Sequence, residues 1–161
     1  MLRNLFVLVI IFCLLLSCEE GNDIITRTTS EQLQYDIKRI KGYIQENQLI
    51  GFSETSSGLH YKLVDNGSGV FPKIGDTLSV DYYGQYLNGS EFDKSNTDEP
   101  FEFILGVGIV IEGWEEGIPF IDEEGSGILI VPSALGYGKN PPSSIPPNSI
   151  LIFSVDLVDI K

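Results

Sequence analysis

The side chains of this sequence that could do chemistry are aromatic rather than nucleophilic. Residues 110–117 include two glycines and the only tryptophan of the chain, Trp114. A segment of about two helical turns does not hold a helix by itself, because isolated helices shorter than ~12–15 residues are marginal in water. We therefore predict a short helix held inside a curved sheet, with Trp114 turned inward as the floor of an aromatic pocket.

Other kinds of site have little support. His60 is the only histidine and has no cysteine near it, so we expect it at the surface of a strand and expect no metal. The two cysteines, Cys13 and Cys18, both lie near the N-terminus, which excludes a disulfide framework in the body of the protein. No cofactor is expected. The formal charge of −13 argues against a nucleic-acid partner and favours solubility, with attraction of basic clients as the alternative.

The N-terminus has the features of a secretory signal. Arg3 precedes an apolar run over residues 5–16, which is too short to cross a bilayer because that takes about 20 residues. The run ends in Leu-Leu-Ser before Cys18, which resembles the lipobox of bacterial lipoproteins. This resemblance implies a signal peptide over residues 1–17 and lipid attachment at Cys18. A plain signal peptide with an incidental Cys18 is the alternative.

Residues 18–29 are expected to form an acidic tether after the lipidated cysteine. Lipid attachment at Cys18 implies a membrane anchor in the bacterial cell envelope. We expect the outer membrane, facing the periplasm. An acidic run after a lipidated cysteine also resembles a surface-export signal, so exposure on the cell surface is the alternative to a simple solvated spacer.

An amphipathic helix followed by a linker is predicted within residues 30–54. Thr28 and Glu31 have the spacing of a capping box. Apolar residues then recur at the helical period: Leu33, Ile37, Ile40 and Ile44. Gly51 is the expected end of the helix. The apolar stripe must be buried, either against the main domain or in a homodimer through residues 30–50, and the sequence does not choose between them.

Residues 55–161 form the main domain, in which strand patterns follow one another closely. Strands are expected over residues 59–64, 77–87, 101–105, 127–131 and 150–160. Asn88-Gly89 is the signal of a two-residue hairpin. Mostly antiparallel strands with one short helix indicate an α+β fold.

Several motifs of this domain occur in order and with compatible spacing. They are Val80-Asp81-Tyr82-Tyr83-Gly84, Gly89-Ser90-Glu91-Phe92-Asp93, Pro100-Phe101-Glu102-Phe103, Val110-Ile111-Glu112-Gly113-Trp114-Glu115-Glu116-Gly117, Val131-Pro132, Leu135-Gly136-Tyr137-Gly138 and Ile145-Pro146-Pro147-Asn148. Together they resemble the FKBP-type peptidyl-prolyl cis-trans isomerases. The resemblance implies a strongly bent antiparallel β-sheet wrapped around one short α-helix. With the lipobox, the chain is also similar to the FKBP-type lipoproteins linked to gliding motility.

The resemblance implies rotation about X-Pro peptide bonds of proline-containing polypeptide clients. The barrier of ~18–20 kcal/mol comes from amide resonance, so no covalent bond has to break. A dry aromatic cleft favours the twisted amide, whose carbonyl is less polar than that of the planar one. The implied catalytic set is Tyr82, Phe92, Asp93, Phe101, Val110, Ile111, Trp114, Tyr137, Ile145 and Phe153. A non-catalytic chaperone or envelope assembly subunit that uses the same cleft is the alternative.

Within this set the resemblance implies distinct roles. Trp114 would be the platform under the proline ring, and the Tyr137 hydroxyl would point at a substrate carbonyl. Ile111 would offer its backbone N–H. Asp93 would be a polar partner at the rim, and Ile145 would close the opposite edge.

Two positions depart from the family pattern. Ile109 stands where an acidic or polar residue often precedes the Val-Ile pair, and only its backbone is expected to contact a ligand. Residues 95–99 contain no basic residue, although one commonly neighbours the rim aspartate. We therefore expect Asp93 to be poorly oriented.

Overall fold

The computed structural model describes residues 27–96 and 99–161. The predicted signal peptide, Cys18 and the tether up to residue 26 lie outside these residues. The described elements are α2 (Thr29–Glu46), β1 (Ser53–Glu54), β2 (His60–Asp65), β3 (Thr77–Tyr86), β4 (Glu91–Lys94), β5 (Phe101–Ile104), α3 (Glu112–Gly117), the 3-10 helix η1 (Ile118–Phe120), β6 (Ser126–Val131), the 3-10 helix η2 (Ser133–Leu135) and β7 (Leu151–Ile160). In this part of the chain, no helix has the length and apolar character needed to cross a membrane.

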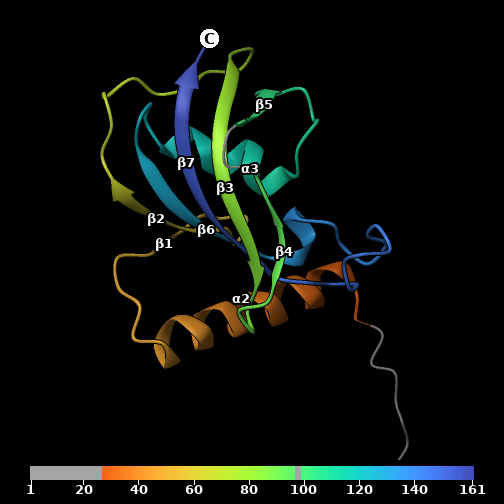
Figure 1. Cartoon of the computed structure of the whole chain (residues 1–161). Coiled ribbons are helices and arrows are strands. Elements are labelled where there is room, and N and C mark those ends of the chain that lie inside the picture. Colours follow the sequence, from red (N-terminus) through yellow and green to blue (C-terminus); the bar gives the residue numbers. More distant parts are fainter. Residues whose placement is uncertain (1–26, 97–98) are drawn as a thin grey trace, which may run out of the picture.

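The strands form one antiparallel sheet in the order β1-β2-β6-β7-β3-β4, with β5 paired to β3. Figure 1 shows the sheet curving around α3, which lies on its concave side. This confirms the predicted α+β fold, a bent antiparallel sheet around one short helix. Each predicted strand is present, with ends that differ by at most one residue from the prediction.

The core lies between the concave face of the sheet and α3. In β7 the alternate residues Leu151, Phe153 and Val155 are buried there, as the period-2 pattern predicts. Two glycines let α3 approach the sheet closely. A Cβ on Gly113 would lie 2.5 Å from the Val131 side chain, and one on Gly117 would lie 2.8 Å from the Leu129 side chain. This close packing holds a helix that is too short to be stable alone.

The hairpin after β3 is longer than predicted. The Tyr86 N–H donates to the Ser90 carbonyl (3.0 Å), which leaves a three-residue loop ending at Gly89 with φ +84°. Such loops place a glycine in the left-handed region, where residues with a Cβ are strained. Strand β4 then has one extra residue, Phe92, between the pairs Gly84–Asp93 and Gln85–Glu91. A bulge of this kind redirects a side chain, and the Phe92 ring lies directly over Gly84.

Helix α2 covers one end of the convex face of the sheet (Figure 1). The predicted capping box is present: the Thr28 hydroxyl accepts from the Glu31 N–H (3.3 Å), and the Glu31 carboxylate accepts from the Thr28 N–H (2.8 Å). Ile40 of α2 is fully buried in a cluster with three residues at the end of the sheet, Ile130, Ile150 and Ile152. The stripe therefore docks on the chain's own sheet, and a homodimer through residues 30–50 stays a prediction.

Two local predictions in this region are wrong, the end of α2 and the exposure of His60. Helix α2 ends at Glu46 rather than near Gly51, because the Asn47 N–H and side-chain amide both cap the Tyr43 carbonyl. The sheet itself begins at Ser53, two residues before the predicted domain start, since β1 pairs with β2.

His60 is buried, with 4% of its surface exposed, instead of lying at the surface of a strand. Its Nδ1 is 3.0 Å from the Gly58 carbonyl, and its Nε2 is 3.9 Å from the Glu54 carboxylate. Glu54 in turn pairs with Lys41 of α2 at 2.8 Å. The helix and β1 thus cover this end of β2. The pattern of the strand alone does not predict that His60 is buried there.

Candidate active site

An aromatic pocket of about 340 Å³ opens between the concave face of the sheet and α3. Its lining comes from β3, β4, β5, β7, α3 and two loops: Tyr82, Asp93, Phe101, Ile109, Val110, Ile111, Trp114, Tyr137 and Phe153. Segments up to about seventy residues apart in the sequence meet here. Eight of the ten residues predicted for the catalytic set line the pocket, together with Ile109.

The floor of the pocket consists of Trp114 and Phe153, which are 4% and 3% exposed. Their rings meet edge to face, with centroids 5.2 Å apart, and the Tyr82 ring meets the indole in the same way at 5.0 Å. Edge-to-face pairs suit the ring quadrupoles and stabilise the arrangement beyond the area buried. The Trp114 Nε1 is buried and has no hydrogen-bond partner among the described residues, so the floor presents an unpaired donor.

The rim of the pocket consists of Asp93, Ile109 and Tyr137, all exposed to solvent. The Tyr82 hydroxyl donates to one oxygen of Asp93 (2.8 Å), and the Lys94 N–H donates to the other (2.9 Å). The expectation that Asp93 is poorly oriented is therefore wrong. Both of its oxygens accept hydrogen bonds from neutral groups, and the side-chain donor among them is Tyr82 of β3.

Both rim-facing phenols are kept in the protonated, donating form. Burial, and then the hydrogen bond to Asp93, raise the pKa of Tyr82 well above its ordinary value. Burial and then the negative charge of Asp93 raise the pKa of Tyr137. Tyr137 keeps 37% of its surface exposed, so its hydroxyl can reach a ligand in the pocket.

Two predicted site residues do not line the pocket. Phe92 packs against Tyr86 and Phe153, at ring distances of 5.1 and 5.5 Å, and supports the floor without reaching the cavity. The bulge in β4 is what places it there. Ile145 is only 9% exposed, and its N–H closes a turn on the Pro142 carbonyl (3.0 Å).

Ile109 contributes more to the pocket than its backbone. It lines the cavity and yet is 64% exposed, so its side chain is an apolar group at the rim. The sequence signal for this was present, since isoleucine stands at a loop position where a polar residue is usual. Single exposed apolar residues are common, however, and the one-residue signal is weak without the pocket beside it.

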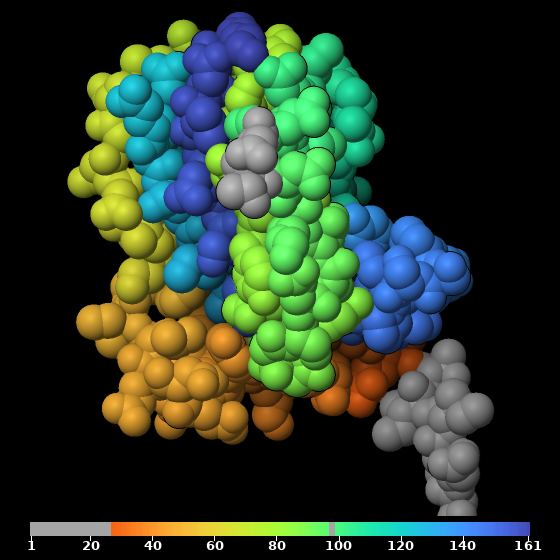
Figure 2. Space-filling model, in the orientation of Figure 1, coloured from red at the N-terminus to blue at the C-terminus, as the bar shows by residue number. Residues whose placement is uncertain are grey.

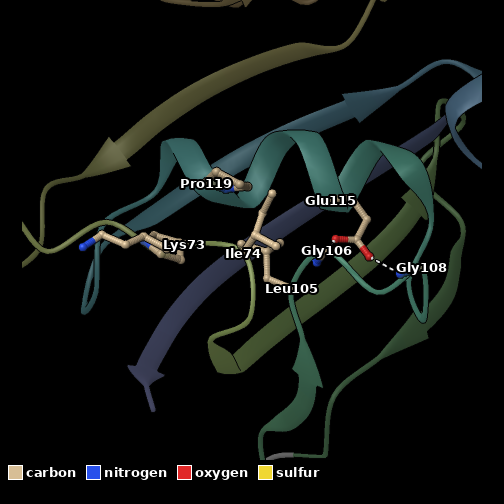
Figure 3. A pocket seen from close by; sticks show the side chains of 8 residues that line it. Lys73, Ile74, Leu105, Gly106, Gly108, Glu115 and Pro119 are labelled. Atoms are coloured by element: carbon tan, nitrogen blue, oxygen red, sulfur yellow. Dashed lines mark hydrogen bonds between the residues drawn. The ribbon is translucent and has the colours of Figure 1, made fainter.

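A larger and mostly apolar hollow of about 810 Å³ is lined by residues that include Ile74, Leu105 and Pro119 (Figure 3). The loop of residues 105–108 forms part of its lining and leads directly into Ile109 at the pocket rim. Glu115 of α3 holds this loop, because its carboxylate accepts from the N–H groups of Gly106 (2.6 Å) and Gly108 (2.9 Å). The hollow has no cluster of reactive side chains, so the aromatic pocket is the better candidate for chemistry.

Comparison with known proteins agrees with this geometry. The family described as FKBP-type peptidyl-prolyl cis-trans isomerase matches residues 68–158, which include every residue of the pocket. The chain belongs to this family. The FKBP-type peptidyl-prolyl cis-trans isomerase FkpA of Escherichia coli K12 is 45% identical over 112 residues, 69% of this chain and 41% of the relative. FK506-binding protein 1 of Yarrowia lipolytica is 40% identical over 107 residues, 65% of this chain and 99% of the relative.

Solved structures place the same FKBP-type domain in a longer chain. The crystal structure of FkpA from Escherichia coli superposes with a TM-score of 0.70 at 39% identity, covering 82% of this chain and 62% of that one. In the sequence comparison, this chain spans about two fifths of the length of its FkpA relative. The superposed part, 82% of this chain, is longer than the family match over residues 68–158.

Proposed function

We propose that this FKBP-type protein catalyses cis-trans isomerisation of X-Pro peptide bonds in polypeptide clients and so assists their folding. The observation that supports this most directly is the open aromatic pocket with Trp114 at its floor. The pocket contains no nucleophile with a base, and none of the described residues form a cluster suited to a metal ion. Bond rotation requires neither, so the pocket suits this reaction better than hydrolysis or group transfer.

The geometry supplies the two things that rotation needs. The floor offers a flat apolar surface for the proline ring, and the surrounding rings exclude water. A planar amide is more dipolar than a twisted one, so an apolar pocket disfavours the ground state relative to the transition state. The Tyr137 hydroxyl, kept protonated, donates to a substrate carbonyl and fixes the chain while the bond turns. Each ~1.4 kcal/mol of differential stabilisation speeds rotation tenfold.

The test is the isomerisation rate of a short X-Pro peptide with the full chain in detergent. Tyr137→Phe combined with Trp114→Ala is expected to abolish the acceleration. Tyr61→Phe is the matched control, because Tyr61 stacks on Phe120 at 4.3 Å outside the pocket lining. A wild-type chain that binds proline-containing clients without accelerating isomerisation would show a non-catalytic chaperone or assembly subunit instead.

We further propose that the protein is lipid-anchored at Cys18 in the bacterial cell envelope, in the outer membrane with the domain facing the periplasm. The support is the sequence Leu-Leu-Ser before Cys18 at the end of a short apolar run. Two or more acyl chains would give stable attachment. Cys18→Ala is expected to abolish labelling by a fatty-acid analogue and release the protein from membranes, whereas Cys13→Ala changes neither. Labelling that survives Cys18→Ala would overturn the proposal.

A further inference from the structure

Helix α2 is joined to the active-site side of the molecule by one buried carboxylate. Asp36 is fully buried, and one of its oxygens accepts from both the N–H (2.9 Å) and the hydroxyl (2.5 Å) of Ser133. The other oxygen accepts from the Gln32 amide (2.7 Å). Ser133 is itself 1% exposed and lies 97 residues away in the sequence. Burial of a carboxylate is costly unless all its partners are in place, so this contact is specific.

Ser133 is also the residue on which the Tyr137 loop is built. Its carbonyl accepts from the N–H groups of Gly136 (3.1 Å) and Gly138 (2.9 Å), which flank Tyr137 on both sides. The Gly138 carbonyl then accepts from the Asn148 N–H (2.8 Å), which closes the base of the following loop. The backbone on both sides of Tyr137 is therefore hydrogen-bonded to Ser133, which is held by the helix.

The arrangement is visible in the overall views. Figures 1 and 2 show the segment after β6, in blue, resting against the N-terminal half of α2, in red-orange. The isoleucine cluster around Ile40 covers the end of the sheet, whereas Asp36 contacts η2, the first turn of the Tyr137 loop. Neighbouring turns of α2 therefore make different contacts: Ile40 packs on the sheet, and Asp36 binds the start of the Tyr137 loop.

We propose that Asp36 is a positioning residue for Tyr137, so that its contact with Ser133, rather than the docking of the helix as a whole, sets the activity of the pocket. The inference rests on the proposed isomerase function. Asp36 touches no pocket-lining residue by hydrogen bond and acts through Ser133 and the loop. Misplacement of a catalytic group by about 1 Å can cost up to ~100-fold in rate, so a loosened loop has a measurable effect.

The experiment is a double-mutant cycle on kcat/KM for a short X-Pro peptide, with the full chain in detergent, well below the unfolding temperature. Asp36→Ala is expected to lower kcat/KM about five- to tenfold in the wild-type background. In the Tyr137→Phe background the same change is expected to cost less than about twofold, because the hydroxyl that Asp36 positions is already absent. Asp36→Asn, which keeps an oxygen for Ser133, is expected to restore activity to within about twofold of wild type.

Ile40→Ala is the control for a merely structural role. It empties a fully buried site on the same helix without touching Ser133, so it should lower the unfolding temperature while leaving kcat/KM unchanged. If Asp36→Ala fails to fold, Ser133→Ala takes its place in the cycle, with an expected loss of about threefold.

The outcomes separate cleanly. Equal losses from Asp36→Ala in both backgrounds, or unchanged kcat/KM with only a lower unfolding temperature, would overturn the inference. So would a Tyr137→Phe variant as active as wild type, because positioning Tyr137 could then not matter. A wild-type chain without isomerase activity would instead refute the proposed function, which is a different result.

Discussion

The floor and the rim of the pocket are built in opposite ways. Trp114 and Phe153 of the floor are buried in ring-to-ring contacts and belong to the same core that stabilises the domain. Asp93, Ile109 and Tyr137 of the rim are exposed and depend on a few hydrogen bonds and loop turns. Tyr82 connects the two, because its ring packs on the indole while its hydroxyl holds Asp93.

This difference separates stability from function. A change in the floor removes packing from the core and a surface for the substrate at once. A change in the rim alters what the substrate meets and leaves the core intact. The floor is therefore expected to tolerate little variation, and the rim is the place where relatives with the same fold can differ in client preference.

The largest effect is expected from Trp114→Ala. Removing a buried aromatic side chain typically costs ~3–5 kcal/mol in the free energy of unfolding, and here it also removes the proposed platform for the proline ring. Urea unfolding followed by circular dichroism and the peptide isomerisation assay measure the two losses. Phe103→Leu is the control, since Phe103 is 3% exposed and packs on the indole at 5.9 Å but does not line the pocket. It should lose stability and keep most of its activity.

Tyr82→Phe tests the residue that connects floor and rim. The ring contact with Trp114 is kept, so the free energy of unfolding should fall by only ~0.5–1.5 kcal/mol, the net worth of one hydrogen bond. Asp93 loses the donor on one oxygen and keeps only the Lys94 N–H on the other. We expect kcat/KM to fall about three- to tenfold. Activity equal to that of wild type would mean that the orientation of Asp93 is irrelevant to the reaction.

Ile109→Glu acts on the rim alone. Ile109 is 64% exposed, so the free energy of unfolding should change by less than ~0.5 kcal/mol. A new carboxylate on the same rim as Asp93 should slow isomerisation of peptides with acidic residues beside the proline about two- to fivefold and speed that of basic ones. Ile109→Gln controls for polarity without charge. The difference between peptides should shrink at high salt, and a difference that persists there would not be electrostatic.

The sequence predicts the floor better than the rim, for a physical reason. Period-2 alternation places Phe153 on the buried face. A short helix is stable only when packed against the sheet, so its large apolar residue, Trp114, is expected to be buried. The position of Phe92 depends on a one-residue bulge, which no local pattern reveals. The orientation of Asp93 depends on the Tyr82 hydroxyl across the hairpin, whereas the family pattern led us to expect a basic neighbour in that role.

The docking of α2 lies between these cases. The amphipathic stripe predicted that the helix is buried but not where. A signal for the location was present, because Ile130 and Ile152 stand at positions of β6 and β7 that alternate away from the core, where polar residues are usual. The contact between Asp36 and Ser133 joins residues 97 positions apart, and the local sequence around neither residue predicts it.

The smallest effect on the pocket is expected from pH, which acts there on Tyr82 and the rim because neither ring of the floor titrates. Folding raises the pKa of both Tyr82 and Tyr137, so the folded state holds these protons more tightly than the unfolded state does. The resulting contribution to stability is complete below the ordinary tyrosine pKa of ~10 and is lost as pH rises through the folded values. Both hydroxyls stay protonated donors, so kcat/KM should vary by less than about twofold between pH 7 and 9. The free energy of unfolding should start to fall only above about pH 10, and less steeply in Tyr82→Phe. A loss of activity near pH 8 in wild type that disappears in Tyr137→Phe would show the opposite shift and contradict the account of the rim.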